Sequence, residues 1–345
     1  PRICGYRLIV GTGARSPVPR SALTMSNPLV DQRAFAEGSA YCVIPAAVLR
    51  VTGSDRLSLL DNLLTQRVRP LAPGDSREAL SLTPEGRVLR VFHIVEEADS
   101  TLLIAPGSAA SDIVEWLDAR IFMEDVSVSE VADVVVVMGR SSLAPESGIA
   151  EWTDPWAHVQ PGGYQYAEGE QPREWDYSEW VVPSSAVATL PIVPATVAEP
   201  LRVIAGRPAL ADVDVTTLPH ELDWMRSAVH LNKGCYPGQE TVAKVHNVGH
   251  PPRRVVRLHL DGSDSVFVAA GDDVLVDGQV VGRITTAGVH FEEGPVALAL
   301  VKRTTPVDAS VTVEHEGIAV AATCEVIVSP TAGAIAGVTR LPTLR

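Results

Sequence analysis

Helix-like and strand-like patterns alternate along the first half of the chain without a fixed repeat. Leu57, Leu60 and Leu64 recur at spacings of three and four behind Ser54-Asp55, which predicts a capped helix with one buried face. Further predicted elements are a hairpin over residues 86–95 and 101–104, an amphipathic helix with Ile113, Val114, Leu117 and Ile121 buried, and a strand at 134–137. The irregular order favours an α+β fold over a doubly wound sheet.

The chain changes character after Pro251-Pro252, where short strands and turn signals follow one another closely. Val256, Leu258 and Leu260 alternate with polar residues, as in a half-buried strand. Asp277-Gly278 lies between two valine-rich segments and is a strong hairpin signal. We therefore predict a C-terminal β-barrel over residues 251–330, preceded by an α+β region over 26–250 and followed by a tail over 331–345.

Length and charge bound the classes of function. A chain of 345 residues is long enough for two or three packed units. Its 28 Lys and Arg residues against 42 Asp and Glu residues give a net charge of −14, which disfavours direct nucleic-acid binding. No apolar run approaches the roughly 18 residues that a membrane span needs. We expect a cytoplasmic protein that does not enter a membrane.

The first 25 residues differ in composition from the rest. Arg, Gly, Ser and Pro surround one short apolar segment, Leu8-Ile9-Val10, which is too short for the apolar core of a secretory signal. We interpret residues 1–25 as a disordered extension that carries no part of the fold.

Aromatic residues are concentrated between positions 151 and 180. They could form a stacking platform for a planar ligand, or they could pack a domain boundary, and the second interpretation is the more ordinary one. The residues concerned are Trp152, Trp156, Tyr164, Tyr166, Trp175, Tyr177 and Trp180.

The surroundings of Cys235 suggest a functional thiol. The spacing of Leu222, Met225 and Val229 predicts a helix over residues 219–230, and Gly234 would end it. A turn at residues 237–238 should then start a second helix, so Cys235 would precede a helix N-terminus and lie two residues from Lys233. Both influences favour a thiolate. The alternative is that Cys235 is a small buried apolar residue.

The four cysteines do not indicate disulfides or zinc. Cys4, Cys42, Cys235 and Cys324 lie far apart in the sequence, with none of the short spacings that are typical of zinc sites. His246 and His250 could in principle join Cys235 around a metal ion, but they lie beside Gly249 and Pro251-Pro252, which is more typical of a turn. We predict no metal site.

The segment 233–240 reads Lys-Gly-Cys-Tyr-Pro-Gly-Gln-Glu and resembles the signature of the YgfZ family, within the superfamily of the glycine-cleavage aminomethyltransferase. The resemblance implies two interlaced ferredoxin-like subdomains around a central folate pocket, plus the barrel. It also implies that tetrahydrofolate or a derivative binds and that the protein serves the synthesis or repair of iron–sulfur enzymes, with iron–sulfur client or assembly proteins as partners. The residues implicated in folate binding are Lys233, Gly234, Tyr236, Gly238, Gln239, Glu240 and Arg202, and Cys235 is the candidate catalytic residue.

Two departures separate this chain from the aminomethyltransferase itself. That enzyme has a Gly-Gly-x-x-Asp-Asp turn, whereas residues 86–91 here read Gly-Arg-Val-Leu-Arg-Val, and its pterin-binding glutamate corresponds to Ile204. Glycine-cleavage chemistry is therefore not expected. A folate-dependent one-carbon transferase remains the alternative, with Asp55, Asp61 or Glu85 supplying the missing carboxylate. A folate-free scaffold that uses its acidic surface to contact other proteins is a third hypothesis.

Overall fold

A computed structural model describes residues 27–167, 175–263 and 265–336. The predicted extension at 1–25 lies outside the described residues, as do residues 337–345 of the predicted tail. The described part of that tail, 331–336, lies against the end of α5 (Gln239–Val248), where the amides of Ile335 and Ala336 donate to the carbonyls of His246 and Asn247. No helix in these ranges is both long and apolar enough to cross a membrane.

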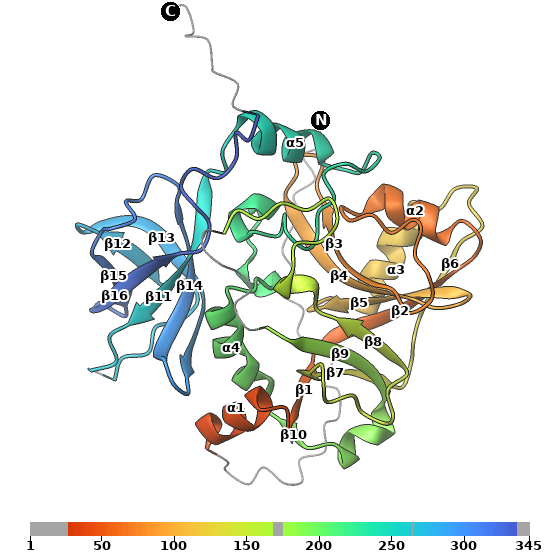
Figure 1. The fold of residues 1–345 in the computed structure, drawn as a ribbon, viewed down its shortest axis with the longest axis horizontal. Helices are drawn as coiled ribbons and strands as arrows, with labels where there is room; N and C mark the ends of the chain where they lie inside the picture. Colours follow the sequence, from red (N-terminus) through yellow and green to blue (C-terminus); the bar gives the residue numbers. More distant parts are fainter. Residues whose placement is uncertain (1–26, 168–174, 264, 337–345) are drawn as a thin grey trace, which may run out of the picture.

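Two five-stranded sheets make up the larger part of the molecule (Figure 1). The first sheet has the order β10 (Ile192–Val193), β1 (Tyr41–Ile44), β7 (Val134–Arg140), β9 (Tyr177–Pro183) and β8 (Ala150–Thr153). The second has the order β3 (Ser76–Leu82), β4 (Val88–Glu96), β5 (Ser100–Pro106), β2 (Ala46–Thr52) and β6 (Ser127–Glu130). The chain passes from the first sheet to the second at Pro45 and returns before β7, so the two units are interlaced.

Apolar cores lie on both faces of the second sheet. Its outer face packs against α2 (Arg56–Leu63) and α3 (Ala110–Asp118), which bury Leu60 and Ile113. Between the sheets, Ile104 of β5 packs with Val136 of β7 and Trp152 of β8. Alternation along each strand therefore supplies an apolar side chain to both layers.

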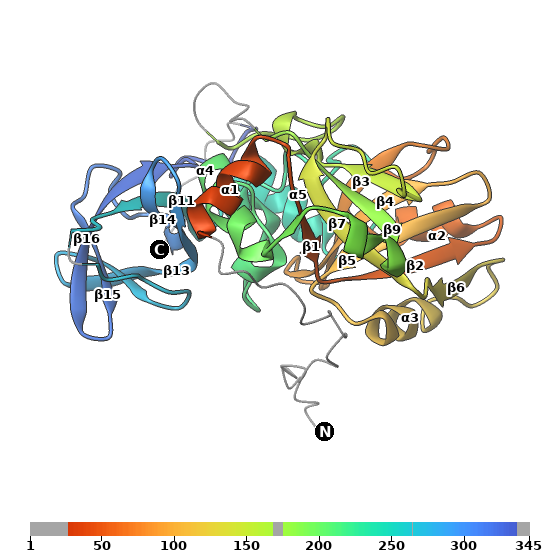
Figure 2. The same ribbon diagram turned by 90° about the horizontal axis from the view of Figure 1, so that it is seen from below.

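The barrel and the sheets are joined through α4 (Ala198–Ala205), which Figure 1 shows between them. The barrel is closed in the order β11 (Arg253–Leu260), β14 (Gly294–Lys302), β13 (Gln279–His290), β12 (Asp273–Val276), β15 (Val311–His315) and β16 (Ile318–Val326). Asp277 and Gly278 both have positive φ, as expected of a tight hairpin. In the view of Figure 2, α1 (Pro28–Ala36) lies beside α4 on the first sheet's side.

The predicted α+β class, interlacing and C-terminal barrel are confirmed, together with the helix after Ser54, the hairpin and the strand at 134–137. Asp55 stands at the N-cap of α2, but its carboxylate does not cap the helix and accepts a hydrogen bond from the Asp125 amide at 2.9 Å. The predicted helix over 219–230 is wrong. Only a 3₁₀ turn, η5 (Pro219–Leu222), forms, because Asp223 adopts a φ of 57° and ends it.

The tryptophans of the aromatic segment are packed inside the protein rather than laid out as a platform. β8 and β9, on either side of it, pair antiparallel. Its indole rings are almost fully buried, at 1% exposure for Trp152, 2% for Trp156 and 4% for Trp175. Of these three, Trp175 lines the cavity described in the next subsection.

Candidate functional site

A cavity of about 300 Å³ lies where the two sheets, α4 and the segment 207–211 meet. We call it the central cavity. Its polar and aromatic lining residues are Glu78, His93, Asp154, Trp175, Glu179, Glu199, Arg202 and Arg207. Its apolar wall includes Ile44, Val91, Met138 and Leu210. A cavity with mainly apolar walls and a few converging polar groups is typical of a site for a small organic molecule.

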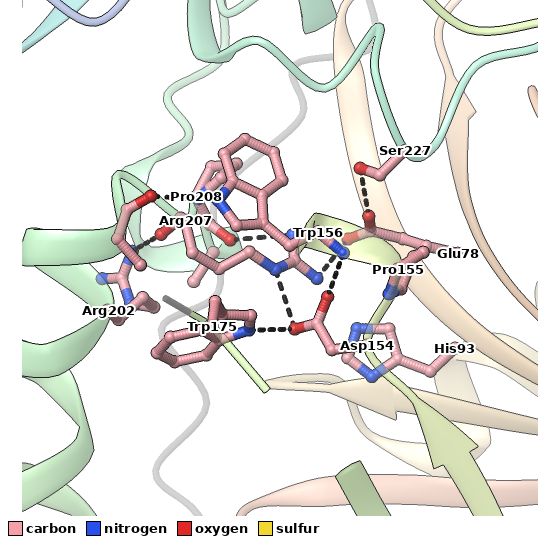
Figure 3. Close-up of polar contacts among 12 residues, drawn as sticks. Glu78, His93, Asp154, Pro155, Trp156, Trp175, Arg202, Arg207, Pro208 and Ser227 are labelled. Atoms are coloured by element: carbon pink, nitrogen blue, oxygen red, sulfur yellow. Dashed lines mark hydrogen bonds and ion pairs between the residues drawn. The ribbon is translucent and has the colours of Figure 1, made fainter. Parts of the chain in front are cut away.

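Arg207 organises the charges at the cavity wall (Figure 3). Its guanidinium contacts the carboxylates of Glu78 at 2.7 Å and Asp154 at 3.0 Å. Ser227 donates a second hydrogen bond to Glu78 at 2.6 Å, and the Trp175 indole donates to Asp154 at 2.7 Å. These carboxylates are thus neutralised and hydrogen-bonded, as buried charges must be. Burial opposes the charge of Arg207, but the two carboxylates outweigh it and raise its pKa.

Arg202 connects α4 to the barrel and is the one predicted site residue that lines the central cavity. It donates to Asp212 at 2.6 Å, to Glu199 at 2.7 Å and to the hydroxyl of Thr286 on β13 at 2.8 Å. The guanidinium is fully engaged with the protein, so it holds the cavity wall in shape. The expectation that Arg202 supports the pocket fits this position.

His93 and Glu179 come from different sheets and form a hydrogen-bonded pair in the cavity wall. The Nδ1 atom of His93 on β4 lies 2.8 Å from a carboxylate oxygen of Glu179 on β9. One face of the imidazole is stacked on the Trp152 ring, with centroids 3.6 Å apart and an angle of 4° between the planes. The pair is buried, but it lines the cavity.

The predicted signature residues lie in a separate loop, 233–240, which we call the signature loop. None of its eight residues lines the central cavity. Its Lys233 turns inward, where the ammonium donates to the carbonyls of Asp61, Leu64 and Gln66 at 2.5, 2.7 and 2.9 Å. Burial lowers the pKa of Lys233 to about 8. This lysine holds the signature loop to the C-terminal end of α2.

The rest of the signature loop divides into buried and exposed residues. Tyr236 and Gly238 are buried, Gln239 is half-buried, and Gly234, Cys235 and Glu240 are exposed. Gln239 is the first residue of α5, as predicted, and its amide donates to the Lys233 carbonyl at 3.3 Å. Cys235 therefore precedes a helix N-terminus at the surface, whereas the alternative of a buried cysteine is not what the structure has.

Gly238 brings the signature loop against the turn at Thr83–Arg87. A Cβ atom on Gly238 would lie 2.7 Å from the carbonyl oxygen of Thr83 and 2.8 Å from the Cα of Gly86. Its φ of 83° is also one that other residues rarely adopt. The signature and the turn that differs from the aminomethyltransferase pattern are thus in direct contact.

The carboxylates that line the cavity were not found from the sequence. The three proposed as replacements lie elsewhere: Asp55 contacts Asp125, Asp61 lies 3.5 Å from Lys233, and Glu85 is exposed in a turn. The alternation of β4 and β9 placed Glu179 and His93 on one face of each strand, but only the tertiary arrangement makes those faces meet. Over residues 27–167, 175–263 and 265–336, no cluster of His, Cys, Asp and Glu could hold a metal ion.

A second, more open hollow lies on the barrel. It has a volume of about 630 Å³ and is lined by β13, Ala270 and the loop around Asp214. Ala211 lies at the border of this hollow and the central cavity and lines both. Arg253 in its wall is already engaged, since it contacts Asp214 at 2.5 Å and Glu221 at 2.8 Å.

Comparison with known proteins supports a common origin with proteins of this fold. No protein-family model matches the chain. It is 24% identical over 300 residues to the putative transferase At1g60990, chloroplastic, of Arabidopsis thaliana, covering 74% of this chain and 63% of the plant protein. It is 23% identical over 221 residues to the tRNA-modifying protein YgfZ of Colwellia psychrerythraea, covering 61% of this chain and 68% of that protein.

Among solved structures, the glycine cleavage system aminomethyltransferase T from Bartonella henselae superposes with a TM-score of 0.67. The match covers 88% of this chain and 89% of that structure at 18% sequence identity, so it shows the fold. The resemblance predicted from residues 233–240 is confirmed: the chain is a distant relative of the proteins named YgfZ and has the fold of aminomethyltransferase T.

Proposed function

We propose that the protein binds tetrahydrofolate or a derivative in the central cavity and serves, in the cytoplasm, the synthesis or repair of iron–sulfur enzymes. The observation that carries the folate part is the central cavity itself. At about 300 Å³ it is at the small end of the range for ligand sites and suits the ring system of a folate, with the tail reaching the mouth. Trp175 and Leu210 offer apolar contacts, and His93 and Glu179 offer polar ones.

A bound folate would be able to carry a one-carbon unit, and the protein's own residues would hold the folate in place. The guanidinium groups of Arg202 and Arg207 are already bonded to carboxylates, so they shape the cavity wall and do not bind the ligand. The name of the YgfZ relatives refers to tRNA modification. Because this chain has a net charge of −14, we propose that any effect of the protein on tRNA modification passes through a client enzyme and not through direct contact with tRNA.

A folate-dependent one-carbon transferase is the second candidate. It is favoured by one observation, the presence of a titratable His–Glu pair in the cavity wall, and by the plant relative's name, putative transferase. If the protein serves iron–sulfur enzymes, the first candidate function, Cys235 on the signature loop would contact the client protein and not the folate, because it is exposed.

Titration of the purified protein with tetrahydrofolate tests the proposal, with two matched tryptophan variants. Ala211→Trp places a large ring at the mouth of the central cavity and should weaken binding at least about tenfold. Ala270→Trp makes the same change at an exposed position that lines only the barrel hollow, and it should bind like the wild type. Loss of binding in Ala270→Trp as well as in Ala211→Trp would move the site to the barrel hollow, which both positions line, and absence of binding by the wild type would refute the folate proposal.

Growth rescue tests the iron–sulfur part separately. Cys235→Ser should bind tetrahydrofolate normally yet fail to rescue a strain that lacks its own YgfZ-like protein. Full rescue by this variant would remove the thiol from the proposed function.

A further inference from the structure

The polar side chains of the central cavity differ in how many hydrogen bonds and ion pairs they make with the protein. Glu78 and Asp154 are each held by Arg207 and by further donors, and Arg202 is held by Asp212 and Glu199. His93 and Glu179 have one described hydrogen bond each, the one between them. The Nε2 atom of His93 and the second oxygen of Glu179 have no described partner, and neither is sealed inside the protein. Both residues line the central cavity, so these two atoms are available for hydrogen bonds to a ligand there.

The imidazole is fixed in one orientation by two independent contacts. Glu179 holds Nδ1 at 2.8 Å, and the parallel Trp152 ring covers one face. Trp152 is itself fixed, because its indole donates to the Arg77 carbonyl at 2.9 Å and its side chain is 1% exposed. A carboxylate at Nδ1 places the proton of the neutral ring there and leaves Nε2 as a base.

The position along β4 is also informative. Val91 stands where the aminomethyltransferase pattern has the second aspartate of its turn, and it lines the cavity. His93 follows two residues later on the same face of the strand. The strand thus has an apolar residue where that pattern has a carboxylate, and it has a base at the next position that faces the cavity.

We propose that His93 is the acid–base residue of the central cavity and that Glu179 is its positioning residue. This rests on the proposed folate site. On binding, the Nε2 lone pair of His93 takes up a proton from solvent, Glu179 neutralises the imidazolium that forms, and the new N–H donates to a nitrogen lone pair of the ligand. Transfer of that proton to the ligand nitrogen returns His93 to its neutral form. The ligand class is a reduced heterocycle with an ionisable ring nitrogen or amine.

The other charged groups around His93 do not substitute for it. Glu78, beside it on β3, and Asp154, after β8, both line the cavity but share the guanidinium of Arg207. The remaining charged groups in the lining, Arg202 and Glu199, contact each other at 2.7 Å. His93 and Glu179 are therefore the one pair in the described lining that can exchange a proton without breaking an ion pair to an arginine.

Calorimetric titration with tetrahydrofolate in buffers of different ionisation enthalpy measures the protons exchanged on binding. The wild type should take up protons on binding, and His93→Gln should bind within about tenfold of the wild type while losing that uptake. Glu179→Gln should reduce the number of protons taken up, because the imidazolium loses its counter-charge. The matched control His315→Gln removes a barrel histidine that also lies 2.8 Å from a carboxylate, Asp272, and should change nothing.

Unchanged proton exchange in His93→Gln would overturn the role of His93 while leaving the folate site intact. A wild type that binds no folate would instead refute the proposed function, and ¹⁵N NMR of the imidazole then tests His93 alone. The proposal expects the neutral ring to have its proton on Nδ1. A ring protonated on Nε2 would contradict the proposal whatever the ligand.

Discussion

The reactivity of a thiol depends on its access to solvent and on the cost of forming its anion. Cys42 is buried in the first sheet, where burial raises the pKa of its thiol to about 12. Cys324 on β16 is half-buried, and burial raises its pKa as well. Cys235 is exposed, ahead of α5 and between two glycines at 234 and 238.

We expect Cys235 to react with iodoacetamide at least about tenfold faster than Cys42 or Cys324, because the thiolate is the nucleophile and the other two thiols resist ionisation. Mass spectrometry of tryptic peptides after timed labelling measures the three rates in one sample. The unfolded protein, in which all the cysteines are accessible, is the control and should show similar rates. Slower labelling of Cys235 than of Cys324 would show that the loop hides the sulfur.

At the scale of elements, the signature loop is held by two contacts of different kinds. Lys233 caps the carbonyls at the end of α2, and Gly238 allows the backbone to approach the turn at Thr83–Arg87. Both contacts connect the start of α5 to the second sheet. The sequence motif therefore encodes a junction between elements as well as an exposed thiol.

Gly238→Ala should destabilise the protein by about 2 to 4 kcal/mol, since it adds a backbone clash to the strain of a positive φ. Gly278→Ala is the matched control. It also has a positive φ, at 71°, but no atom lies within 4 Å of the added Cβ, so it should cost only about 1 kcal/mol. Urea unfolding measures both, and equal losses would mean that the contact with Gly86 is unimportant.

The elements could be predicted where one local pattern decided them. The helix after Ser54, the strand at 134–137 and the Asp277-Gly278 hairpin have periodicities or turn residues that leave little choice. The segment 219–230 has a helical apolar spacing, yet Asp223, Glu221 and Arg226 are buried there and bond to distant groups. Tertiary hydrogen bonds determine the backbone conformation of this segment, and the spacing of apolar residues contains no information about them.

Across the whole molecule, buried titratable groups act in opposite directions on stability. Burial raises the pKa of Asp223 to about 7 and lowers the pKa of His220 to about 3. Between about pH 4 and pH 7 the folded protein keeps a proton on Asp223 that the unfolded chain releases, so this residue favours the folded state less as pH rises. His220 has the opposite effect between about pH 3 and pH 6.5, because there the unfolded chain binds the proton.

The Asp223→Asn variant separates these effects. Asparagine tolerates the φ of 57° and can still accept from the Tyr166 amide. The stability of the wild type relative to the variant should be greatest near pH 4 and should decrease toward pH 7. Over this range the proton bound to Asp223 in the folded state is held against an increasing cost of protonation. Chemical unfolding at several pH values measures the difference. A difference that grows with pH would place the carboxylate in its charged form.

The central cavity could not be predicted, because its walls come from segments that are distant in sequence. Glu78, His93, Glu179 and Arg207 belong to two sheets and a connecting loop, and only the crossing of the chain between the sheets brings them together. The signature located a motif of the family, while the position of the cavity depends on the fold. Of the site residues implicated from the sequence, Arg202 is the one that lines the central cavity.

The placement of β1 has a consequence for synthesis on the ribosome. β1 pairs antiparallel with β7 and parallel with β10, which emerge about 90 and 150 residues after it. Its neighbour β2 can join β5 once residue 106 has emerged, whereas β6 ends at residue 130, just before β7 begins at residue 134. During translation strands β2 to β5 of the second sheet can therefore associate while β1 still has two unpaired edges, and an unpaired edge can pair with a wrong partner. The nascent chain is most open to chaperone capture in the interval before residue 134 emerges.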